Sequence, residues 1–369
     1  MRRVKQYESA GVDYDVLDAA KRAALRSATQ TTATHLAALG GRPLTESRGE
    51  PAFVFEARGG TFAAVLECLG TKSVLARRYA EEGGGDRFFD VGVDAVSAIV
   101  NDLVCVGALP LVVHAYFATG DVSWYADEAR HRSLVDGWRA GCEAAGAIWG
   151  GGESPTLPGL VNGADIELAG SAVGLVAGGT PILGADLAPG DEIVLVESSG
   201  LHTNGASLVR AVADGLPQGL RTPIADGTEI GAAALEASCI YVPLIAEVLR
   251  PERGLGVTYL SHITGHGLRK LMRAAKALTY RVRALPEVPP VLAALASHAG
   301  MDAHSAYGTL NMGVGFAIFC RAGDGAGVVA AATDMGFPAA VSGVVEEGPR
   351  RVLLEPVEVS FTGEELELR

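Results

Sequence analysis

The stretch FFDVGVDAVSAIVNDLVCVGALPL, residues 88–111, combines the pattern of a buried helix with acidic and amide side chains. Its apolar residues recur at positions i, i+3, i+4, i+7 and i+8, namely Val96, Ile99, Val100, Leu103 and Val104. This spacing predicts a helix that packs one face against a core.

A second stripe of the same helix is polar. Asp94 and Asn101 lie seven residues apart, about two helical turns, so they share one side of the helix. The rest of this stripe consists of small residues: Ser97, Ala98 and Cys105. Two interpretations remain open. Either Asp94 caps the helix while Asn101 and Asp102 face water, or the stripe lets a charged ligand come close.

The bulk properties of the chain limit its class. Its 369 residues favour about two domains, and 49% hydrophobic with 20% charged residues is an ordinary globular composition. The net charge of −13 argues against an extended nucleic-acid surface, because a phosphate backbone requires Lys and Arg. A nucleotide ligand stays compatible with this charge, since it needs only a local site.

The cysteines and apolar runs bear on the location of the protein. The five cysteines are scattered and never form a C-x-x-C pair, which is typical of reduced thiols and indicates no zinc site. The basic start MRRVKQYESAG is not followed by an apolar segment, so no signal peptide is expected. Apolar runs such as ALPLVVHAYFA are too short to cross a bilayer. We therefore expect a soluble, cytoplasmic protein without a membrane partner.

Helical and strand-like patterns alternate along the chain, which predicts an α/β (α+β) fold. Residues 52–67 are expected to form two strands joined at Gly59-Gly60. Helices are expected over residues 126–146, 229–249 and 267–278. The Gly- and Pro-rich residues 177–191 form the best candidate boundary, so we predict two domains, 1–178 and 179–369.

Two loops of the first domain could carry chemistry. Gly70-Thr71-Lys72 follows a predicted strand and is preceded by Glu67, so the lysine could contact a phosphate and the carboxylate a metal ion. The spacing is not that of a P-loop, and the alternative is a surface turn. WGGGESPTLPG, residues 149–159, places three glycines before Glu153, which suits either Mg²⁺ binding or a plain connecting loop.

Two loops of the second domain share one pattern. ESSGLHTNGASLVR (197–210) and SHITGHGLRKLMR (261–273) each place small polar residues between a strand and a helix. Free backbone N–H groups at a helix start can bind an anion, so the pair of junctions favours phosphate binding. His202 in the first of these loops is either a capping residue or faces the ligand.

The chain resembles the phosphoribosylformylglycinamidine cyclo-ligases, also called aminoimidazole ribonucleotide synthetases, over nearly its whole length. The matching motifs follow the family's order: YESAGVD (7–13), GTK (70–72), VGVDAVSAIVNDLVCVGALPL (91–111), YFATG (116–120), GGESPTLPG (151–159), SSGLHTNGASLVR (198–210), SHITGHGL (261–268) and LNMGVGF (310–316). Ordered matches to several independent loops are specific for the superfamily and less so for the exact reaction.

The resemblance implies a two-domain fold whose N-terminal domain contributes strands to a barrel at the interface of a homodimer, with ATP in a cleft. In that family ATP phosphorylates the formamide oxygen of formylglycinamidine ribonucleotide. A neighbouring nitrogen then closes the ring, which gives aminoimidazole ribonucleotide, ADP and phosphate. The chain is thereby expected to be an ATP-dependent ligase of purine biosynthesis that requires Mg²⁺ and binds a ribonucleotide substrate.

The resemblance also implies site residues, position by position. Lys72 and His202 would act in catalysis. ATP would contact Glu67, Gly70, Thr71, Lys72, Asp94 and Asn101. Mg²⁺ would be held by Glu67, Asp94 and Glu153. The substrate would be bound by Ser199, Gly200, His202, Asn204, Thr264, Gly265 and His266.

The chain departs from the family pattern in several loops. Glu67 and Cys68 stand where the family has an aspartate and a glycine, and His266 enters the glycine loop T-G-G-G. Cys239 and Gly308 stand where the family has arginine, a residue that binds phosphate through two parallel hydrogen bonds. Three functions therefore stay open: a cyclo-ligase, a paralogue that uses ATP to activate a related oxygen on a different substrate, or a catalytically silent nucleotide-binding homologue.

Overall fold

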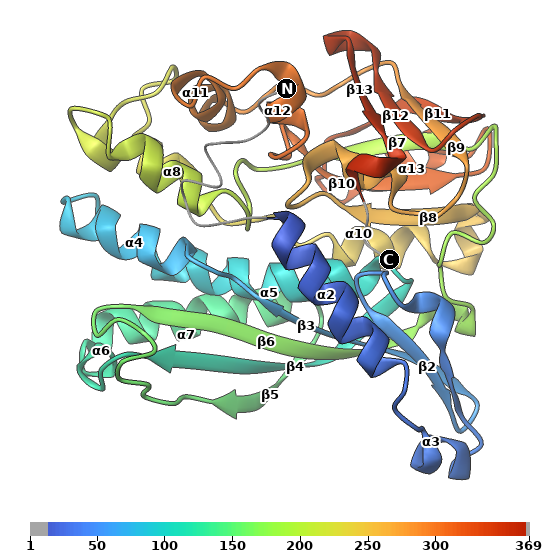
Figure 1. Ribbon diagram of the computed structural model, residues 1–369, viewed down its shortest axis with the longest axis horizontal. Helices are drawn as coiled ribbons and strands as arrows, with labels where there is room; N and C mark the ends of the chain where they lie inside the picture. Colours follow the sequence, from blue (N-terminus) through green and yellow to red (C-terminus); the bar gives the residue numbers. More distant parts are fainter. Residues whose placement is uncertain (1–13, 367–369) are drawn as a thin grey trace.

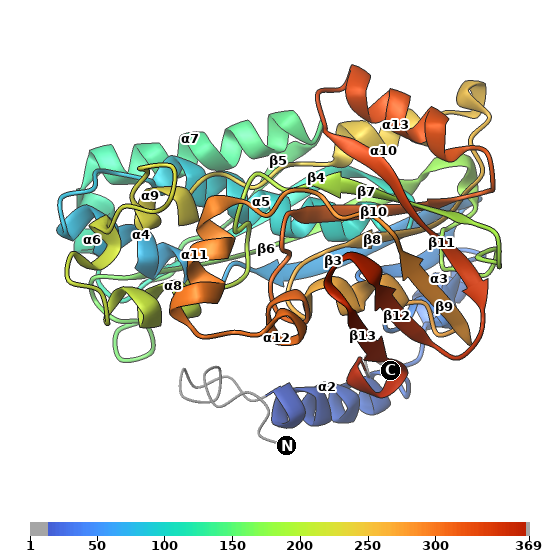
Figure 2. The same ribbon diagram turned by 90° about the horizontal axis from the view of Figure 1, so that it is seen from above.

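The computed structural model describes residues 14–366, which form two mixed α/β domains packed against each other (Figures 1 and 2). One domain is built on a six-stranded sheet and the other on a seven-stranded sheet. This confirms the predicted α/β (α+β) fold with two domains. The predicted division at 178/179 falls inside the short 3₁₀-helix Ala177–Gly179 and stays a prediction. The motif YESAGVD (7–13) lies outside the described residues.

The first sheet has the strand order β1-β2-β3-β6-β4-β5. Its strands are β1 (Arg42–Leu44), β2 (Phe53–Ala57), β3 (Gly60–Cys68), β4 (Ala108–Thr119), β5 (Ile148–Glu153) and β6 (Ile166–Val176). Only β4 and β5 run parallel; the other neighbours are antiparallel. The predicted hairpin is confirmed as β2 and β3, and Arg58 and Gly59 at its tip have φ values of 48° and 77°. A tight hairpin turn requires such left-handed values.

One face of this sheet is covered by α5 (Phe88–Val104) and α7 (Glu128–Ala144), which confirms both predicted helices (Figure 1). The predicted apolar stripe of α5 is buried, with no member more than 1% exposed. The two helices cross closely at glycine. A Cβ on Gly92 would lie only 2.4 Å from the carbonyl oxygen of Leu134, so the crossing depends on the missing side chain.

The opposite face of the first sheet is apolar and open. Leu66 and Ile148 are 74% and 73% exposed, and Leu175 on the central strand β6 is 41% exposed. Phe62 and Val173 are half-buried on the same face. Successive residues of a strand point to opposite sides, so this row is the counterpart of the buried residues that contact α5.

The second sheet has the order β13-β12-β9-β11-β7-β10-β8. Its strands are β7 (Glu192–Glu197), β8 (Val257–His262), β9 (Leu278–Val282), β10 (Val314–Cys320), β11 (Ala339–Glu347), β12 (Arg351–Leu354) and β13 (Val359–Thr362). The remaining α-helices of the described chain are α2 (Tyr14–Ala28), α3 (Thr34–Ala38), α4 (Lys72–Glu81), α6 (Ser123–Ala126), α8 (Ala206–Ala213), α9 (Ile230–Ala234), α10 (Val242–Val248), α11 (Pro290–His298), α12 (Ala303–Tyr307) and α13 (Gly325–Asp334). Within residues 14–366, none of the helices is long and apolar enough to span a bilayer.

Two predicted helices of the second domain differ from the structure. The helix expected over residues 229–249 is divided into α9 and α10, because the backbone between them leaves the helical path and bonds to side chains of α5. The helix expected over 267–278 is a 3₁₀-helix, η5 (Gly267–Met272), and the chain enters β9 at Leu278.

The interpretation of Asp94 as a helix cap is wrong. The N-cap of α5 is Arg87, so Asp94 lies well inside the helix. Asp94 and Asn101 are 0% exposed and Asp102 is 8% exposed, so the expectation that Asn101 and Asp102 face water is also wrong. The second domain covers this stripe, and α5 is therefore buried on both sides.

Candidate functional site

A cleft of about 430 Å³ lies between the two domains. The first domain contributes the segment before β2, the end of β3 with the loop after it, and α5, through Glu50, Pro51, Glu67, Cys68, Leu69, Gly70, Ala98 and Asp102. The second domain contributes the loop after β7, the end of β8 with the loop after it, and η5 with the residue that follows, through Thr203, Asn204, His262, Thr264, Gly265, His266, Lys270 and Arg273. Acidic side chains line the first wall, and basic side chains line the second.

The cleft brings together six of the predicted site residues: Glu67, Gly70, Asn204, Thr264, Gly265 and His266. The other predicted residues do not line it: Thr71, Lys72, Asp94, Asn101, Glu153, Ser199, Gly200 and His202. Their ligand roles stay predictions, and most of them instead form contacts within the second domain or between the two domains.

Lys72 and Asp94 form a buried ion pair at the boundary between the domains. The Lys72 Nζ lies 2.5 Å from the Asp94 Oδ2, and both side chains are 0% exposed. Lys72 also donates to the backbone oxygens of His202 (2.8 Å) and Glu236 (3.4 Å) in the second domain. The other oxygen of Asp94 accepts hydrogen bonds from the backbone N–H and the hydroxyl of Ser238. In this arrangement the ion pair joins the two domains, and the Lys72 side chain is fully buried and does not line the cleft.

Asn101 extends the same boundary about two helical turns further along the same stripe of α5. Its Nδ2 donates to the Cys239 oxygen at 2.9 Å, and its Oδ1 accepts from the Tyr241 N–H at 2.9 Å. A single amide thus satisfies a donor and an acceptor of a buried, non-helical backbone segment, as such groups require. The polar stripe of α5 therefore binds the second domain of its own chain.

Asp102 pairs with a histidine that the sequence reasoning did not select. The Asp102 Oδ1 lies 2.7 Å from the His262 Nδ1, and both residues line the cleft. Burial alone would raise the pKa of Asp102, but the hydrogen bond and charge of His262 outweigh it and lower that pKa to about 2. Burial lowers the pKa of His262 below 6.5 despite this carboxylate. The neutral imidazole then donates through Nδ1, and its Nε2 has no hydrogen-bond partner among residues 14–366.

His202 is buried next to the cleft wall and supports the loop that carries it. Its Nε2 accepts a hydrogen bond from the Ser199 N–H at 3.0 Å, so the ring proton lies on Nδ1, which is buried without a partner. Burial lowers the pKa of His202 well below 6.5, and the charges of His262 and Lys72 act in the same direction. Its φ of 61° is the left-handed backbone of a tight turn. Ser199 and Gly200 are likewise bonded within this domain, to Ala237 and Asn311.

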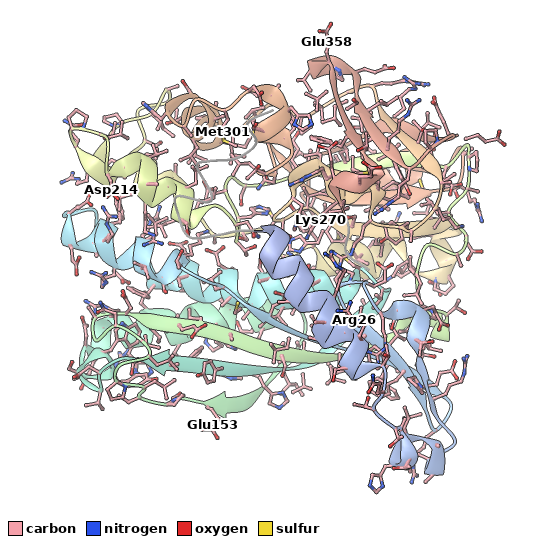
Figure 3. The ribbon with its side chains drawn as sticks, in the orientation of Figure 1. Arg26, Glu153, Asp214, Lys270, Met301 and Glu358 are labelled. Carbon is pink, nitrogen blue, oxygen red and sulfur yellow. The ribbon has the colours of Figure 1, made fainter. Side chains whose placement is uncertain are left out.

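The three predicted Mg²⁺ ligands do not form one cluster. Glu67 lines the cleft, whereas both carboxylate oxygens of Asp94 are already bonded, one to Lys72 and one to Ser238. Glu153 is exposed at the outer edge of the sheet (Figure 3). Within residues 14–366, no group of three or more His, Cys, Asp or Glu side chains could hold a metal ion. The residues therefore do not fit a Mg²⁺ site made by this chain alone. A Mg²⁺ ion carried on nucleotide phosphates needs only one or two carboxylates.

Two basic residues at the end of η5, Lys270 within it and Arg273 directly after it, were missed by the sequence reasoning. They follow the T-G-H-G loop at an i, i+3 spacing and line the cleft. The Arg273 Nη2 donates to the Gly49 oxygen at 2.9 Å, and its Nε lies 3.8 Å from the Glu50 carboxylate. Their spacing, directly after a loop already assigned to phosphate binding, could have identified them. The walls of the cleft thus offer cationic donors and polar backbone of the kind that a nucleotide phosphate requires.

The two positions where the family has arginine lie outside this cleft. Cys239 belongs to the backbone segment held by Asn101. Gly308 has little room for a side chain, because a Cβ there would lie 3.0 Å from the Phe361 ring and 2.8 Å from the His304 oxygen. The Arg269 guanidinium instead donates to the Gly308 carbonyl oxygen.

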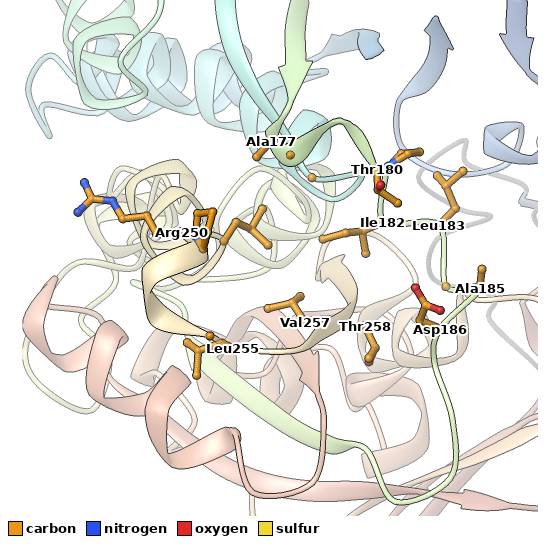
Figure 4. A pocket seen from close by; sticks show the side chains of 17 residues that line it. Ala177, Thr180, Ile182, Leu183, Ala185, Asp186, Arg250, Leu255, Val257 and Thr258 are labelled. Atoms are coloured by element: carbon orange, nitrogen blue, oxygen red, sulfur yellow. The ribbon is translucent and has the colours of Figure 1, made fainter. Parts of the chain in front are cut away.

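A second cavity, of about 370 Å³, lies between residues 177–186 and 249–258 (Figure 4). Apolar side chains such as Ile182, Leu255 and Val257 line much of it. It contains none of the predicted site residues, so the cleft between β3 and η5 is the better candidate for the chemistry.

Comparison with known families agrees with this arrangement of domains. Residues 49–176 match the family described as AIR synthase related protein, N-terminal domain, and residues 188–354 match the corresponding C-terminal domain. The chain therefore belongs to the AIR synthase family. It is 31% identical over 278 residues to the phosphoribosylformylglycinamidine cyclo-ligase of Methanocaldococcus jannaschii, which covers 75% of this chain and 76% of that protein. The cyclo-ligase of Methanococcus maripaludis is 29% identical over 280 residues, 76% of each chain.

Solved structures share the fold at lower identity. The hydrogenase maturation protein HypE in complex with ATP superposes with a TM-score of 0.59 at 20% identity, covering 83% of this chain and 85% of that one. AaThiL complexed with AMPPCP and TMP superposes with a TM-score of 0.57 at 15% identity, covering 85% and 90%. These likenesses establish the fold and leave the substrate to be argued from the site.

Proposed function

We propose that this protein is an ATP-dependent cyclo-ligase that converts formylglycinamidine ribonucleotide into aminoimidazole ribonucleotide in the cytoplasm. The observation that carries the proposal is the 31% identity to a cyclo-ligase over three quarters of both chains, together with the polar cleft between the two domains. Family motifs reach both walls of this cleft, through Gly70 of GTK and through the loop after β8, and they support the same assignment.

The reaction requires the activation of a poor leaving group. An amide oxygen takes the γ-phosphoryl group of ATP, so the P–O bond to ADP breaks as the bond to the amide oxygen forms. The neighbouring nitrogen then attacks the activated carbon, the C–O bond breaks, phosphate leaves and the nitrogen loses a proton. In such a reaction the protein positions the reactants and neutralises charge. Glu67, Asn204, Thr264 and Gly265 are placed to do so from opposite walls.

The assembly proposed here is a homodimer. The exposed apolar face of the first sheet, with Leu66, Ile148 and Leu175, offers a second copy a large surface to cover. β5 is an edge strand of this sheet, and one of its sides has no neighbouring strand in the described part of the chain. Closure of two such sheets around each other would form the barrel that the resemblance implies.

A paralogous function is favoured by one observation. The family arginines are replaced by Cys239 and by Gly308, a position with little room for a side chain. A substrate that lacks the group bound by those arginines would suit this site. The same ATP-dependent activation of an amide or related oxygen would then act on that substrate.

The test is ADP release by the purified protein with Mg-ATP, with and without formylglycinamidine ribonucleotide. We expect ADP and aminoimidazole ribonucleotide in equal amounts, and no ADP without substrate. Glu67→Gln is expected to lower turnover, whereas Glu143→Gln on the exposed side of α7 serves as its matched control. ATP binding without turnover of this substrate would refute the cyclo-ligase assignment in favour of the paralogue, and no ATP binding would favour the silent homologue.

A further inference from the structure

Lys270 is a buried cation without an anionic partner. It is 7% exposed, and its Nζ donates to the Thr264 hydroxyl, a neutral group. In the part of the chain that the structure describes, no carboxylate forms an ion pair with it. Asp102 is the carboxylate whose charge acts most strongly on Lys270, but its hydrogen bond goes to His262. A charge removed from water in this way is costly unless an opposite charge is bound.

Lys72, the other buried lysine of this boundary, differs from Lys270 because its charge is paired with a carboxylate. Lys72 has a carboxylate at 2.5 Å and two backbone oxygens, and it is sealed from solvent. Lys270, in contrast, lines the cleft at the boundary between the domains (Figure 3). Burial lowers the pKa of Lys270 below its ordinary 10.5, and the charge of Asp102 only partly offsets this. An anion entering the cleft would supply the missing partner.

Arg273 adds a second cation to the same wall of the cleft. Arg273 is the residue directly after η5, and both it and Lys270 line the cleft. Arg273 is anchored by its bond to the Gly49 oxygen; among the described residues its Nε makes no hydrogen bond and lies 3.8 Å from the Glu50 carboxylate. Two cations side by side, one of them anchored, suit the spread negative charge of a phosphate.

We propose that Lys270, with Arg273 beside it, binds a phosphate group of the ligand in the cleft. The inference rests on the proposed function in so far as that function brings phosphate-bearing ligands to the cleft. It also accounts for the departures from the family pattern. With Cys239 and Gly308 away from the cleft, η5 supplies the positive charge that a phosphate requires. The group bound is either the phosphate chain of ATP or the phosphate monoester of a ribonucleotide.

Calorimetric titration of the full chain with Mg-ATP, formylglycinamidine ribonucleotide and inorganic phosphate, each alone, separates the two sources. Lys270→Met is expected to weaken binding of the ligand whose phosphate lies there by about 10- to 100-fold, the usual effect of losing a charged hydrogen bond. Lys270→Arg keeps the charge and is expected to bind within about tenfold of the wild type. Arg132→Gln removes an exposed cation from α7 and should change nothing.

A purely structural role would give a different pattern. Because Lys270→Met removes a buried charge that has no anionic partner, it should unfold at a temperature equal to or above that of the wild type. Wild-type binding should weaken as the pH rises through the lowered pKa of Lys270, and Lys270→Met should lack this dependence. Binding of all three ligands by Lys270→Met within about twofold of the wild type would overturn the inference.

Failure of the proposed function can be told from failure of this inference. If the wild type releases no ADP but binds a phosphate compound through Lys270, the cyclo-ligase assignment falls and the phosphate site stands. If the wild type catalyses the reaction and Lys270→Met binds the ligands and catalyses it equally well, the cyclo-ligase assignment stands and the phosphate site at Lys270 falls. If the wild type binds none of the three compounds, the phosphate site is refuted.

Discussion

The buried ion pair of Lys72 and Asp94 gives a prediction that decides between two roles for this lysine. Lys72→Met preserves most of the side-chain volume but leaves the Asp94 carboxylate at 0% exposure, with Ser238 as its remaining hydrogen-bond donor. Removal of one partner from a buried pair typically costs about 3–5 kcal/mol, because the other charge stays desolvated. We expect the free energy of unfolding to fall by that amount.

The measurement is urea unfolding followed by circular dichroism. With a slope of about 3 kcal/mol per molar urea, the midpoint should fall by about 1–1.7 M. Lys72→Met/Asp94→Asn removes both charges, keeps acceptors for Ser238, and should recover at least half of the loss. Lys276→Met is the matched control, because Lys276 donates to two backbone oxygens and should cost about 1 kcal/mol.

The opposite result would refute this reasoning. If Lys72→Met unfolds within about 1 kcal/mol of the wild type but no longer binds Mg-ATP, the ion pair does not hold the domains together. Lys72 would then contact the phosphates, as the resemblance to the cyclo-ligases implies. A loss of stability with unchanged affinity for Mg-ATP would assign Lys72 to the domain boundary.

Two further predictions concern pH and assembly. Burial lowers the folded-state pKa of His202 and His262 below 6.5, so on acidification the unfolded chain takes up protons before the folded one does. The free energy of unfolding should therefore fall as the pH drops below about 6.5, by at most about 1.4 kcal/mol per pH unit for each histidine. Urea midpoints at pH 7.5 and 5.5 test this, and equal midpoints would contradict it. If the proposed dimer forms through the open sheet face, Leu175→Arg should give a monomer in light scattering, whereas Val122→Arg, at an exposed site away from the strands, should not. A wild type that is already monomeric would refute the proposed assembly.

The sequence was sufficient for the elements whose pattern is local. The stripe from Val96 to Val104 predicts α5 because helical periodicity depends on neighbouring residues alone. The hairpin of β2 and β3 follows from Gly59 and the flanking alternation. The loop after β8 lines the cleft, and its small residues between a strand and a helix are what favoured a phosphate site in the sequence; the ligand role itself stays a prediction.

The partners of the polar residues could not be predicted in the same way. The hydrogen-bond partners of Asp94 and Asn101 are Ser238, Cys239 and Tyr241. Nothing in the sequence near α5 indicates which distant segment will cover this helix. A buried carboxylate that binds backbone has the same local pattern as one that binds a metal. Only the tertiary fold distinguishes them.

The sequence distance across this boundary has a consequence for biosynthesis. The hydrogen bonds of Lys72, Asp94 and Asp102 to the second domain span 130, 144 and 160 residues. While the chain emerges from the ribosome, α5 can pack against its own sheet, but its polar stripe has no partner until β8 and the segment before α10 have been translated. The polar stripe of α5 therefore stays uncovered for longer than its apolar stripe, and the contacts that join the two domains are of the non-local kind that slows folding.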